Sequence, residues 1–247
     1  MTTGGSGGSL QKVTLTKAAP TVSLTKGSGA TGQMRVNLNW NAGTKGLFRK
    51  AQSIDLDLGC LYELTDGSKG VVQALGNAFG RLDGPPYIQL DGDDRSGSAT
   101  GGENLSINLE HLHEIKRVLV FAFIYEGVPA WSRADGVVTL YPQGGAPIEV
   151  ALDEHSGSRM CAVALLSSTG SSLDVRREIR YVDGSQQALD RMYSWGMDTG
   201  GPGASSRAQP TSAGSCSGLR RRSAIEDTSA KPMKPTPVSP VTTSGTW

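Results

Sequence analysis

An alternation of apolar and polar residues with a period of two runs through most of this chain and limits the folds that it can adopt. Residues 34–40 alternate without a break, and residues 54–62 do the same, which places Asp55 and Asp57 together on the face opposite the apolar side chains. Such a pattern is typical of a β-strand with one face on a core. Residues 118–125 are apolar throughout, which predicts a central strand covered on both faces.

Further strand-like segments follow one another at short intervals. They lie at residues 13–16, 22–25, 71–75, 106–109, 137–141, 148–152, 160–166 and 173–181. Turn signals rich in Gly, Pro and Asp separate many of these segments, and only residues 186–193 have helical spacing, with Leu189, Met192 and Tyr193 on one face. We therefore predict an all-β fold: a two-sheet β-sandwich with one short C-terminal helix and disordered ends.

The first and last parts of the chain differ from its body in composition. Residues 1–10 are mostly Gly, Ser and Thr, and residues 198–247 are rich in Gly, Pro and Ser with more basic than acidic side chains. Neither composition buries enough apolar surface to order the chain. We expect a flexible N-terminal segment (1–10), one folded domain (11–197) and a disordered basic tail (198–247). Near the start, two copies of a Val-x-Leu-Thr-Lys motif, at 13–17 and 22–26, predict two neighbouring edge strands.

Charge and cysteine content argue against several classes of protein. The formal net charge is +1, which indicates no nucleic-acid partner. Cys60, Cys161 and Cys216 are widely scattered and include no CxxC pair, so they form neither a disulfide framework nor a zinc site. The first nine residues lack the basic start and apolar core of a signal peptide, and no apolar run approaches the ~20 residues of a spanning helix. We expect a cytoplasmic protein with no transmembrane segment.

Acidic side chains are concentrated in two segments, one within the strand at 54–62 and one in the Gly-rich loop at 91–97, which is followed by a glutamate. Together they supply the candidate metal ligands Asp55, Asp57, Asp91, Asp93, Asp94, Ser96 and Glu103. Hard oxygen donors of this kind suit Ca²⁺, with Mg²⁺ second, and argue against zinc and copper. The loop alone could be an ordinary turn, because Asp and Gly are common turn formers. Two carboxylates on one strand face repel each other unless a cation lies nearby, so the two segments together favour a metal.

The acidic loop does not fit an EF-hand. With Asp91 at loop position 1, Ser96 occupies position 6, where Gly is needed, and Gly102 occupies position 12, where Glu is needed. Its ligands must therefore be completed from elsewhere in the chain, and the two strand aspartates are the best donors. The predicted site is a tertiary one that exists only in the folded sandwich.

In combination, the Leu-Thr-Lys starts, the acidic strand at 55–57 and the loop at 92–97 resemble the TerD-domain proteins, the bacterial tellurium-resistance and general stress family. The run at 34–40, the stretch at 91–97 and the closing residues 193–196 are most similar to its TerA-like branch. The resemblance covers about residues 11–197. It implies a β-sandwich that binds two neighbouring calcium ions between loops, with no catalysis by the domain itself.

The family's ligand pattern can be carried over to this chain position by position. The resemblance assigns ligand roles to Asp55, Asp57, Asp93, Asp94, Ser96 and Glu103. Two departures matter: Asp94 stands where the family has Asn, and the acidic run before the glutamate is reduced to residues 101–103. We therefore expect one of the two calcium positions to be weak or absent, with Asp91 as a possible replacement ligand.

These observations lead to one expected function and two alternatives. We expect a calcium-binding stress-response protein of the tellurium-resistance type, with one or two Ca²⁺, that acts as a binding or scaffold module and is not an enzyme. Its expected partners are other stress-response proteins or a membrane-associated complex. One alternative is a C2-like module that binds anionic lipid through calcium and needs basic or apolar loop tips. The other is an enzyme acting on tellurium oxyanions, which the cysteines support poorly because two of them look buried.

Several other features have a structural interpretation. The pair His111 and His113 is typical of a solvated bend between strands rather than a metal site. The basic run at 176–180 is typical of the solvent face of a strand, with Glu178 offsetting part of its charge. Trp131 and Trp195 are expected to pack rather than to bind a ligand. The chain has no Gly-x-Ser-x-Gly stretch and no phosphate loop.

Overall fold

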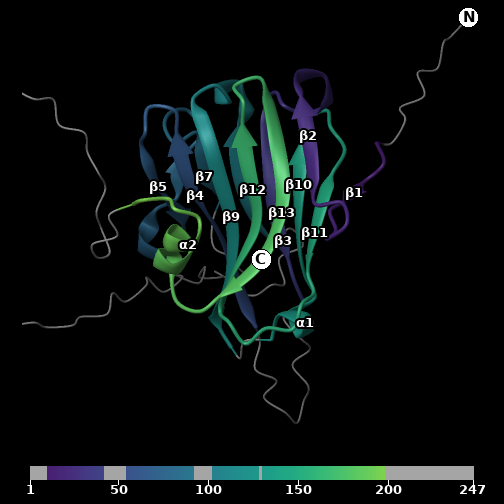
Figure 1. Ribbon diagram of the computed structural model, residues 1–247, viewed down its shortest axis with the longest axis vertical. Coiled ribbons are helices and arrows are strands. Elements are labelled where there is room, and N and C mark those ends of the chain that lie inside the picture. Colours follow the sequence, from purple (N-terminus) through teal and green to yellow (C-terminus); the bar gives the residue numbers. More distant parts are fainter. Residues whose placement is uncertain (1–9, 42–53, 92–101, 128–129, 198–247) are drawn as a thin grey trace, which may run out of the picture. The chain divides into compact units, whose positions relative to one another are not determined.

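The computed structural model describes residues 10–41, 54–91, 102–127 and 130–197, all within one compact unit, Met1–Ser206. These residues form two β-sheets that pack against each other (Figure 1). The predicted all-β, two-sheet sandwich is therefore confirmed. The predictions for segment 1–9, for the tail 198–247 and for Asp93, Asp94 and Ser96 lie outside the described residues.

Within the described residues, the first sheet has seven strands. Their order is β1 (Val13–Thr14), β11 (Ile148–Leu152), β10 (Gly136–Pro142), β3 (Gln33–Asn39), β8 (Glu103–Asn108), β7 (Ile88–Leu90) and β6 (Gly80–Arg81). Strand β1 pairs with β11 in parallel, and the other neighbours pair antiparallel.

The second sheet has six strands over the same ranges, all paired antiparallel. Their order is β2 (Thr21–Thr25), β13 (Ser172–Val182), β12 (Met160–Ser168), β9 (Ile115–Glu126), β4 (Asp55–Leu64) and β5 (Lys69–Gln73). The helices are α1 (Trp131–Ala134) and α2 (Gln186–Met192), with 3₁₀ turns η1 (Lys26–Ser28), η2 (Leu75–Asn77) and η3 (Leu109–His111). None of these helices is long and apolar enough to cross a membrane.

The main core lies between the two sheets and follows from the period-two pattern. Val36 and Leu38 of β3 and Leu56 and Leu58 of β4 are all fully buried in it. Alternate residues of a strand point to the same face, so one apolar face per sheet is enough to build this layer. The period-two pattern of the sequence therefore accounts for the inner faces of both sheets.

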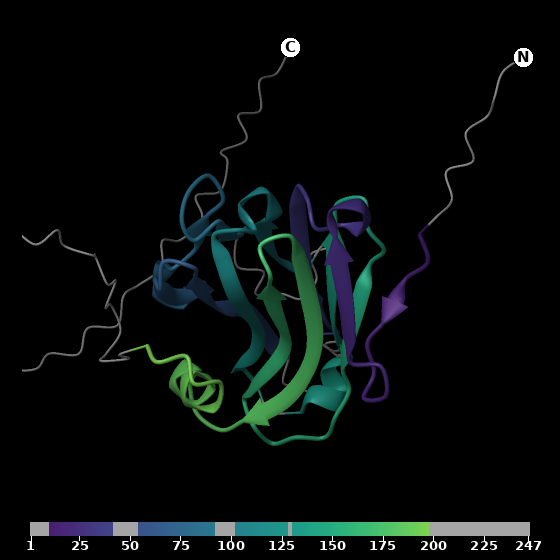
Figure 2. The ribbon, with the colours of Figure 1, turned by 45° about the horizontal axis from the view of Figure 1, so that its top comes forward.

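A second apolar cluster lies on the outer face of the six-stranded sheet, next to α2 (Figure 2). Its buried members are Leu61, Leu119, Phe121, Phe123, Met160, Ala162, Leu189 and Trp195. Strand β9 contributes alternate side chains to this cluster and to the main core, which confirms the prediction of a central strand covered on both faces.

The predicted helix is present, but its apolar stripe is only partly right. Leu189 is fully buried, whereas Met192 is 43% exposed. The helix ends at Met192, and Ser194 adopts a positive φ of 49°. Beyond this turn, Trp195 is fully buried in the outer apolar cluster together with Leu189.

The prediction of two neighbouring edge strands near the start of the chain is wrong in its pairing. Both β1 and β2 are edge strands, but β1 pairs with β11 in one sheet and β2 pairs with β13 in the other. The period-two pattern predicts a strand and a buried face, and it carries no information about which strand lies beside it. The short strands β6 and β7 and the short helix α1 were not predicted.

Candidate functional site

The described carboxylates that were predicted as ligands belong to the ends of strands. Strand β4 begins at Asp55 and β8 begins at Glu103, while Asp91 directly follows β7. The backbone amide of Asp91 donates to the carbonyl of Asn104 at 3.0 Å, which places Asp91 beside the start of β8. The tertiary structure therefore brings Asp91 and Glu103 to the same end of the seven-stranded sheet.

A direct hydrogen bond joins this end of the seven-stranded sheet to the six-stranded sheet. The Oε2 atom of Glu103 accepts from the backbone amide of Leu58 in β4 at 2.6 Å. Leu58 follows Asp57, so Glu103 reaches the strand that carries both predicted aspartate ligands.

Three of these carboxylates are buried. The exposed fraction is 8% for Asp55, 5% for Asp57 and 2% for Glu103, whereas Asp91 is exposed. Burying a carboxylate is costly unless donors or a cation lie beside it, and each of the three buried residues has such polar or electrostatic interactions. A register shift between Asp55 and Leu56 adds one residue, Tyr125, on the β9 side of the pairing.

The donor chemistry fits a hard cation, because all four described candidates offer carboxylate oxygens. Among residues 10–41, 54–91, 102–127 and 130–197, however, no three His, Cys, Asp or Glu side chains form a group that could hold a metal ion. The described carboxylates are therefore not a complete ligand set by themselves.

Gly102 fixes the position of Glu103 through a close contact between backbones. Its φ is +59°, and a Cβ atom at this residue would lie 2.2 Å from the carbonyl oxygen of Leu38. Leu38 pairs with Glu103 at the junction of β3 and β8. Only glycine allows this approach without strain, so the start of β8 depends on it.

Two asparagines beside this end were missed by sequence reasoning. The Nδ2 atom of Asn37, which is 7% exposed, donates to Oδ1 of Asn104 at 2.9 Å. The same oxygen accepts from the guanidinium of Arg35 at 3.0 Å. Asn37 stands at a polar position of an alternating strand, where sequence alone gives no reason to expect burial.

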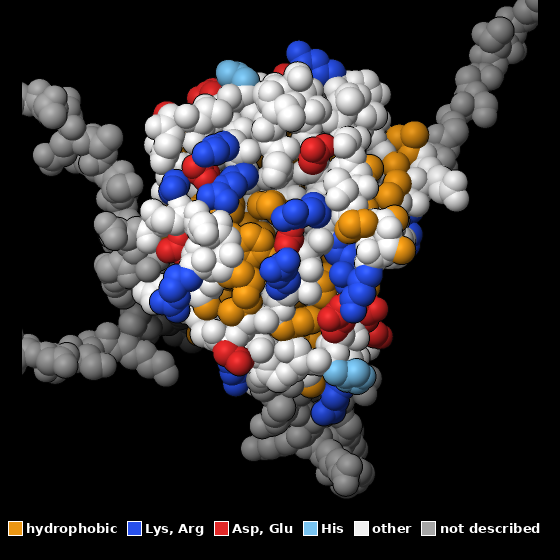
Figure 3. Space-filling model, viewed as in Figure 1, with side chains coloured by type: hydrophobic (Ala, Val, Ile, Leu, Met, Phe, Trp, Pro, Cys, Tyr) orange, Lys and Arg blue, Asp and Glu red, His pale blue; other side chains and the backbone are white. Residues whose placement is uncertain are grey.

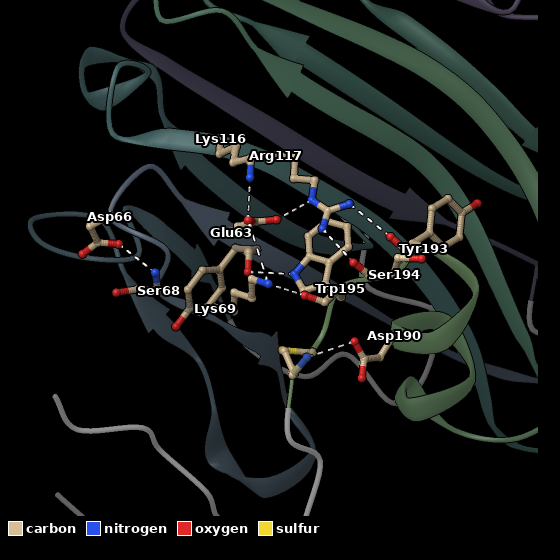
Figure 4. Close-up of polar contacts among 12 residues, drawn as sticks. Glu63, Asp66, Ser68, Lys69, Lys116, Arg117, Asp190, Tyr193, Ser194 and Trp195 are labelled. Atoms are coloured by element: carbon tan, nitrogen blue, oxygen red, sulfur yellow. Dashed lines mark hydrogen bonds and ion pairs between the residues drawn. The ribbon is translucent and has the colours of Figure 1, made fainter.

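A second polar cluster surrounds Glu63 on the outer face of the six-stranded sheet (Figure 4). Its carboxylate lies 2.8 Å from Lys116 Nζ, 2.6 Å from Arg117 Nε and 4.0 Å from Lys69 Nζ. Burial by itself raises the pKa of Glu63. The hydrogen bonds from Lys116 and Arg117, together with the charges of Arg117 and Lys69, outweigh burial and hold the pKa below its usual range.

Arg117 fastens the segment that follows α2 onto the sheet (Figure 4). Its Nη1 and Nη2 atoms donate to the carbonyls of Tyr193 and Ser194 at 3.1 and 3.3 Å. Its guanidinium carbon lies 3.9 Å from the ring centroid of Trp195, whose indole nitrogen donates to the Tyr62 carbonyl at 3.0 Å. Lys69 donates to the Trp195 carbonyl. Trp195 is fully buried, and the expectation that it packs is confirmed.

The other features noted in the sequence also have structural roles. The ring of His111 stacks on Tyr87 at 4.0 Å between centroids, and its Nδ1 lies 2.8 Å from Oε1 of Glu114. His113 is 67% exposed at its side chain, as expected for a solvated bend. Cys60 and Cys161 are buried, and burial raises the pKa of both thiols well above the usual range.

Known proteins are similar to this chain in fold or in sequence. No family model matches the chain. A solved protein of unknown function is similar with a TM-score of 0.50 and 17% identity, covering 63% of this chain and 92% of that one. A homologue of the telluride resistance protein TerD from Streptomyces coelicolor A3(2) has a TM-score of 0.49 and 20% identity, covering 65% of this chain and 95% of that one.

One curated relative is similar to this chain in sequence over most of its length. The tellurium resistance protein TerA of an Alcaligenes species is 48% identical in an alignment of 196 residues that covers 76% of this chain and 57% of the relative. This chain therefore spans a little over half the length of that relative. The fold is a two-sheet β-sandwich with buried carboxylates at one end. This is the type of domain that the sequence motifs resemble. The chain belongs to the TerD-domain family of tellurium-resistance proteins.

Proposed function

We propose that this chain is a calcium-binding protein of the tellurium-resistance and stress-response kind, which acts as a binding or scaffold module rather than as an enzyme. The observation that carries the proposal is the burial of Asp55, Asp57 and Glu103 at strand ends, with Glu103 bonded to the β4 backbone. Oxygen donors of this type suit Ca²⁺ better than zinc or copper.

The proposed ligand set combines strand ends with the acidic loop. Its members would be Asp55, Asp57, Asp91, Asp93, Asp94, Ser96 and Glu103, holding one or two Ca²⁺. The positive charge of the ion would offset the repulsion between these carboxylates. Because Glu103 already joins the two sheets, an ion held beside it would rigidify this end of the sandwich and prepare it to contact a partner.

The partners and location that we propose follow from the family. The relative's name connects it with tellurium resistance, and we propose the same role for this chain. We propose other stress-response proteins or a membrane-associated complex as partners and a cytoplasmic location. Burial of the Cys60 and Cys161 thiols supports a role without thiol-based reduction of tellurium oxyanions, because a reactive cysteine needs an accessible thiolate.

Thermal unfolding with added calcium tests this proposal. An ion that binds only the folded state at about 100 times its Kd adds about 2.7 kcal/mol. For a domain of this size that corresponds to a rise in Tm of roughly 5–10 °C. The substitution Asp57→Asn should abolish the rise. The matched control Asp83→Asn, at a carboxylate that is 85% exposed in the turn after β6, should leave it intact.

Calorimetric titration gives the number of ions. One or two equivalents of Ca²⁺ per chain, with much weaker binding of Mg²⁺, would agree with a flexible oxygen site. An unchanged melting curve at millimolar calcium, together with no heat of binding, would refute the proposal.

A further inference from the structure

The outer face of the six-stranded sheet carries basic side chains around an apolar strip (Figure 3). On β13, Arg176 lies opposite Leu165 of β12, and Arg180 lies opposite Ala162. On the far side of the strip, Lys116, Arg117 and Lys69 surround Glu63. The sequence indicated only the basic run at 176–180. The other three cations, Lys69, Lys116 and Arg117, lie on this face because β5 and β9 belong to the same sheet as β13.

Two acidic side chains of this face, Glu178 and Glu63, lie beneath the basic ones, while Asp174, two residues before Arg176 on β13, accepts a hydrogen bond from Ser23 Oγ at 2.6 Å. The side chain of Glu178 is 3% exposed, whereas those of Arg176 and Arg180 are 52% and 61% exposed. Glu178 accepts from Arg176 Nε at 2.6 Å and from the Tyr193 hydroxyl at 2.8 Å, and it lies 3.5 Å from Arg180 Nε. Glu63 is similarly covered, with a side chain that is 6% exposed. Around these two glutamates, the charge presented to solvent is therefore positive.

Glu178 also orients the two arginines. Each guanidinium uses its Nε atom on the shared carboxylate, and within the described residues its terminal nitrogens form no hydrogen bond. A guanidinium fixed in this way keeps a pair of parallel N–H groups for a second carboxylate, which arginine recognises in bidentate geometry. The side-chain entropy lost on binding is smaller because the contact to Glu178 already restricts the arginines.

The apolar strip between these cations is only partly covered by the chain itself. Helix α2 and Trp195 cover the apolar side chains of β4 and β9, including Leu61 and Leu119. Leu165 and Val182 pack against the same cluster but remain partly exposed on β12 and β13. Apolar surface therefore continues past the part that α2 protects, at Leu165 opposite Arg176 and at Val182 two residues beyond Arg180.

We propose that this face docks an acidic amphipathic helix of a partner protein, laid beside α2. Its apolar stripe would cover Leu165 and Val182, and carboxylates at its border would pair with Arg176 and Arg180. Helix α2 already packs on this sheet through Leu189, so the face accepts a helix. Arginine, tyrosine and aliphatic side chains are also typical of protein interfaces. The chain's own tail carries more basic than acidic side chains and does not complement this face.

A designed peptide tests the proposal on the full chain. The probe is a fluorescein-labelled amphipathic helix of about 18 residues, long enough to be helical, with a leucine stripe bordered by glutamates. Its binding is followed by fluorescence anisotropy at low salt with a calcium chelator present. We expect binding that weakens as salt is added, because exposed charges are screened. We expect the double variant Arg176→Gln, Arg180→Gln to lower the affinity at least tenfold.

The matched control is the double variant Lys12→Gln, Arg81→Gln. It removes the same charge from two exposed cations, Lys12 just before β1 and Arg81 of β6, each of which also lies beside a carboxylate. It should bind the peptide like the unchanged chain. A second test variant, Leu165→Ser, leaves the arginines and Glu178 in place and should also weaken binding, so the proposal stays testable if the arginine variant folds poorly.

The outcomes separate this proposal from its rivals. Failure of the peptide to bind, or equal loss in the control variant, would overturn it. Binding of phosphatidylserine vesicles that depends on Arg176 and Arg180, without peptide binding, would assign the face to a membrane and also overturn it. Because the chelator is present throughout, the result does not depend on whether the chain binds calcium.

Discussion

Replacing Trp195 by alanine should destabilise the protein strongly, although the residue lies outside the main core. Its side chain is fully buried against the outer face of the six-stranded sheet, where it contacts the cluster that includes Phe121. Its indole nitrogen donates to the Tyr62 carbonyl, and Arg117 stacks on its ring. The substitution would open a cavity on the outer face of the sheet and would remove the indole donor from the part-buried Tyr62 carbonyl.

The size of the effect follows from these contacts. Truncating a buried tryptophan or phenylalanine to alanine costs about 3–5 kcal/mol. Loss of a cation–π contact adds about 0.5–2 kcal/mol, depending on how far the cation is desolvated. The substitution Trp195→Phe keeps most of the apolar contact and loses the indole donor, so it should cost roughly 1–3 kcal/mol. We therefore expect the free energy of unfolding to be lowest for Trp195→Ala, higher for Trp195→Phe and highest for the unchanged chain.

Urea unfolding followed by circular dichroism measures these differences. Met192→Ala, at the last residue of α2, is the control, because that side chain is 43% exposed and its loss should change the free energy of unfolding by less than about 0.5 kcal/mol. Hydrogen exchange should show faster exchange in α2 of the alanine variant. If Trp195→Ala shifts the free energy of unfolding by less than about 1 kcal/mol with an unchanged m-value, the assigned packing role is wrong.

Two further predictions concern stability. The lowered pKa of Glu63 means that its contribution is present above the ordinary glutamate pKa of about 4.3 and is lost as pH falls through the lower, folded-state value. The unchanged chain should therefore lose more stability below about pH 5 than Glu63→Gln does, as measured by Tm against pH; parallel curves would contradict this. The substitution Gly102→Ala should lower the free energy of unfolding by about 1–2 kcal/mol, because alanine is strained in the left-handed conformation of this residue. The loss should be larger still because the added Cβ would lie too close to the carbonyl oxygen of Leu38. In urea unfolding Gly102→Ala should therefore cost more than Gly67→Ala, where φ is +88° and the space is open; equal costs would contradict the contact.

Much of the sandwich could be predicted because its cause is local. The apolar run at 118–125 falls within β9, and the alternation at 54–62 corresponds closely to β4, since burial of alternate residues needs only one strand and one core. Helix α2 was predicted from its spacing, but Met192 is exposed, and Trp195, beyond the end of the helix, is buried in the cluster that Leu189 joins. The prediction that β1 and β2 are neighbours was wrong, because the alternating pattern of a strand does not indicate which strand pairs with it.

The candidate calcium site was predicted only in its chemistry. The sequence indicated oxygen donors in two separate segments and therefore a tertiary site, but it could not show that Glu103 would bond to the Leu58 amide. It also could not show that Asp55 and Asp57 would be buried, since a period-two pattern assigns polar residues to the solvent face. Burial of these carboxylates depends on what packs against the strand ends.

By itself, the sequence determined the all-β class, the inner faces of the two sheets and the chemical type of the proposed ligands. Each of these follows from residue type and spacing along one strand or loop. Only the tertiary structure decided which strands are neighbours, that cations of β5, β9 and β13 share one face, and that Glu63 and Glu178 lie beneath them. The reason is physical: strand order, register and bulges such as the one between Ala162 and Ala164 arise from packing between distant segments, which no local pattern records.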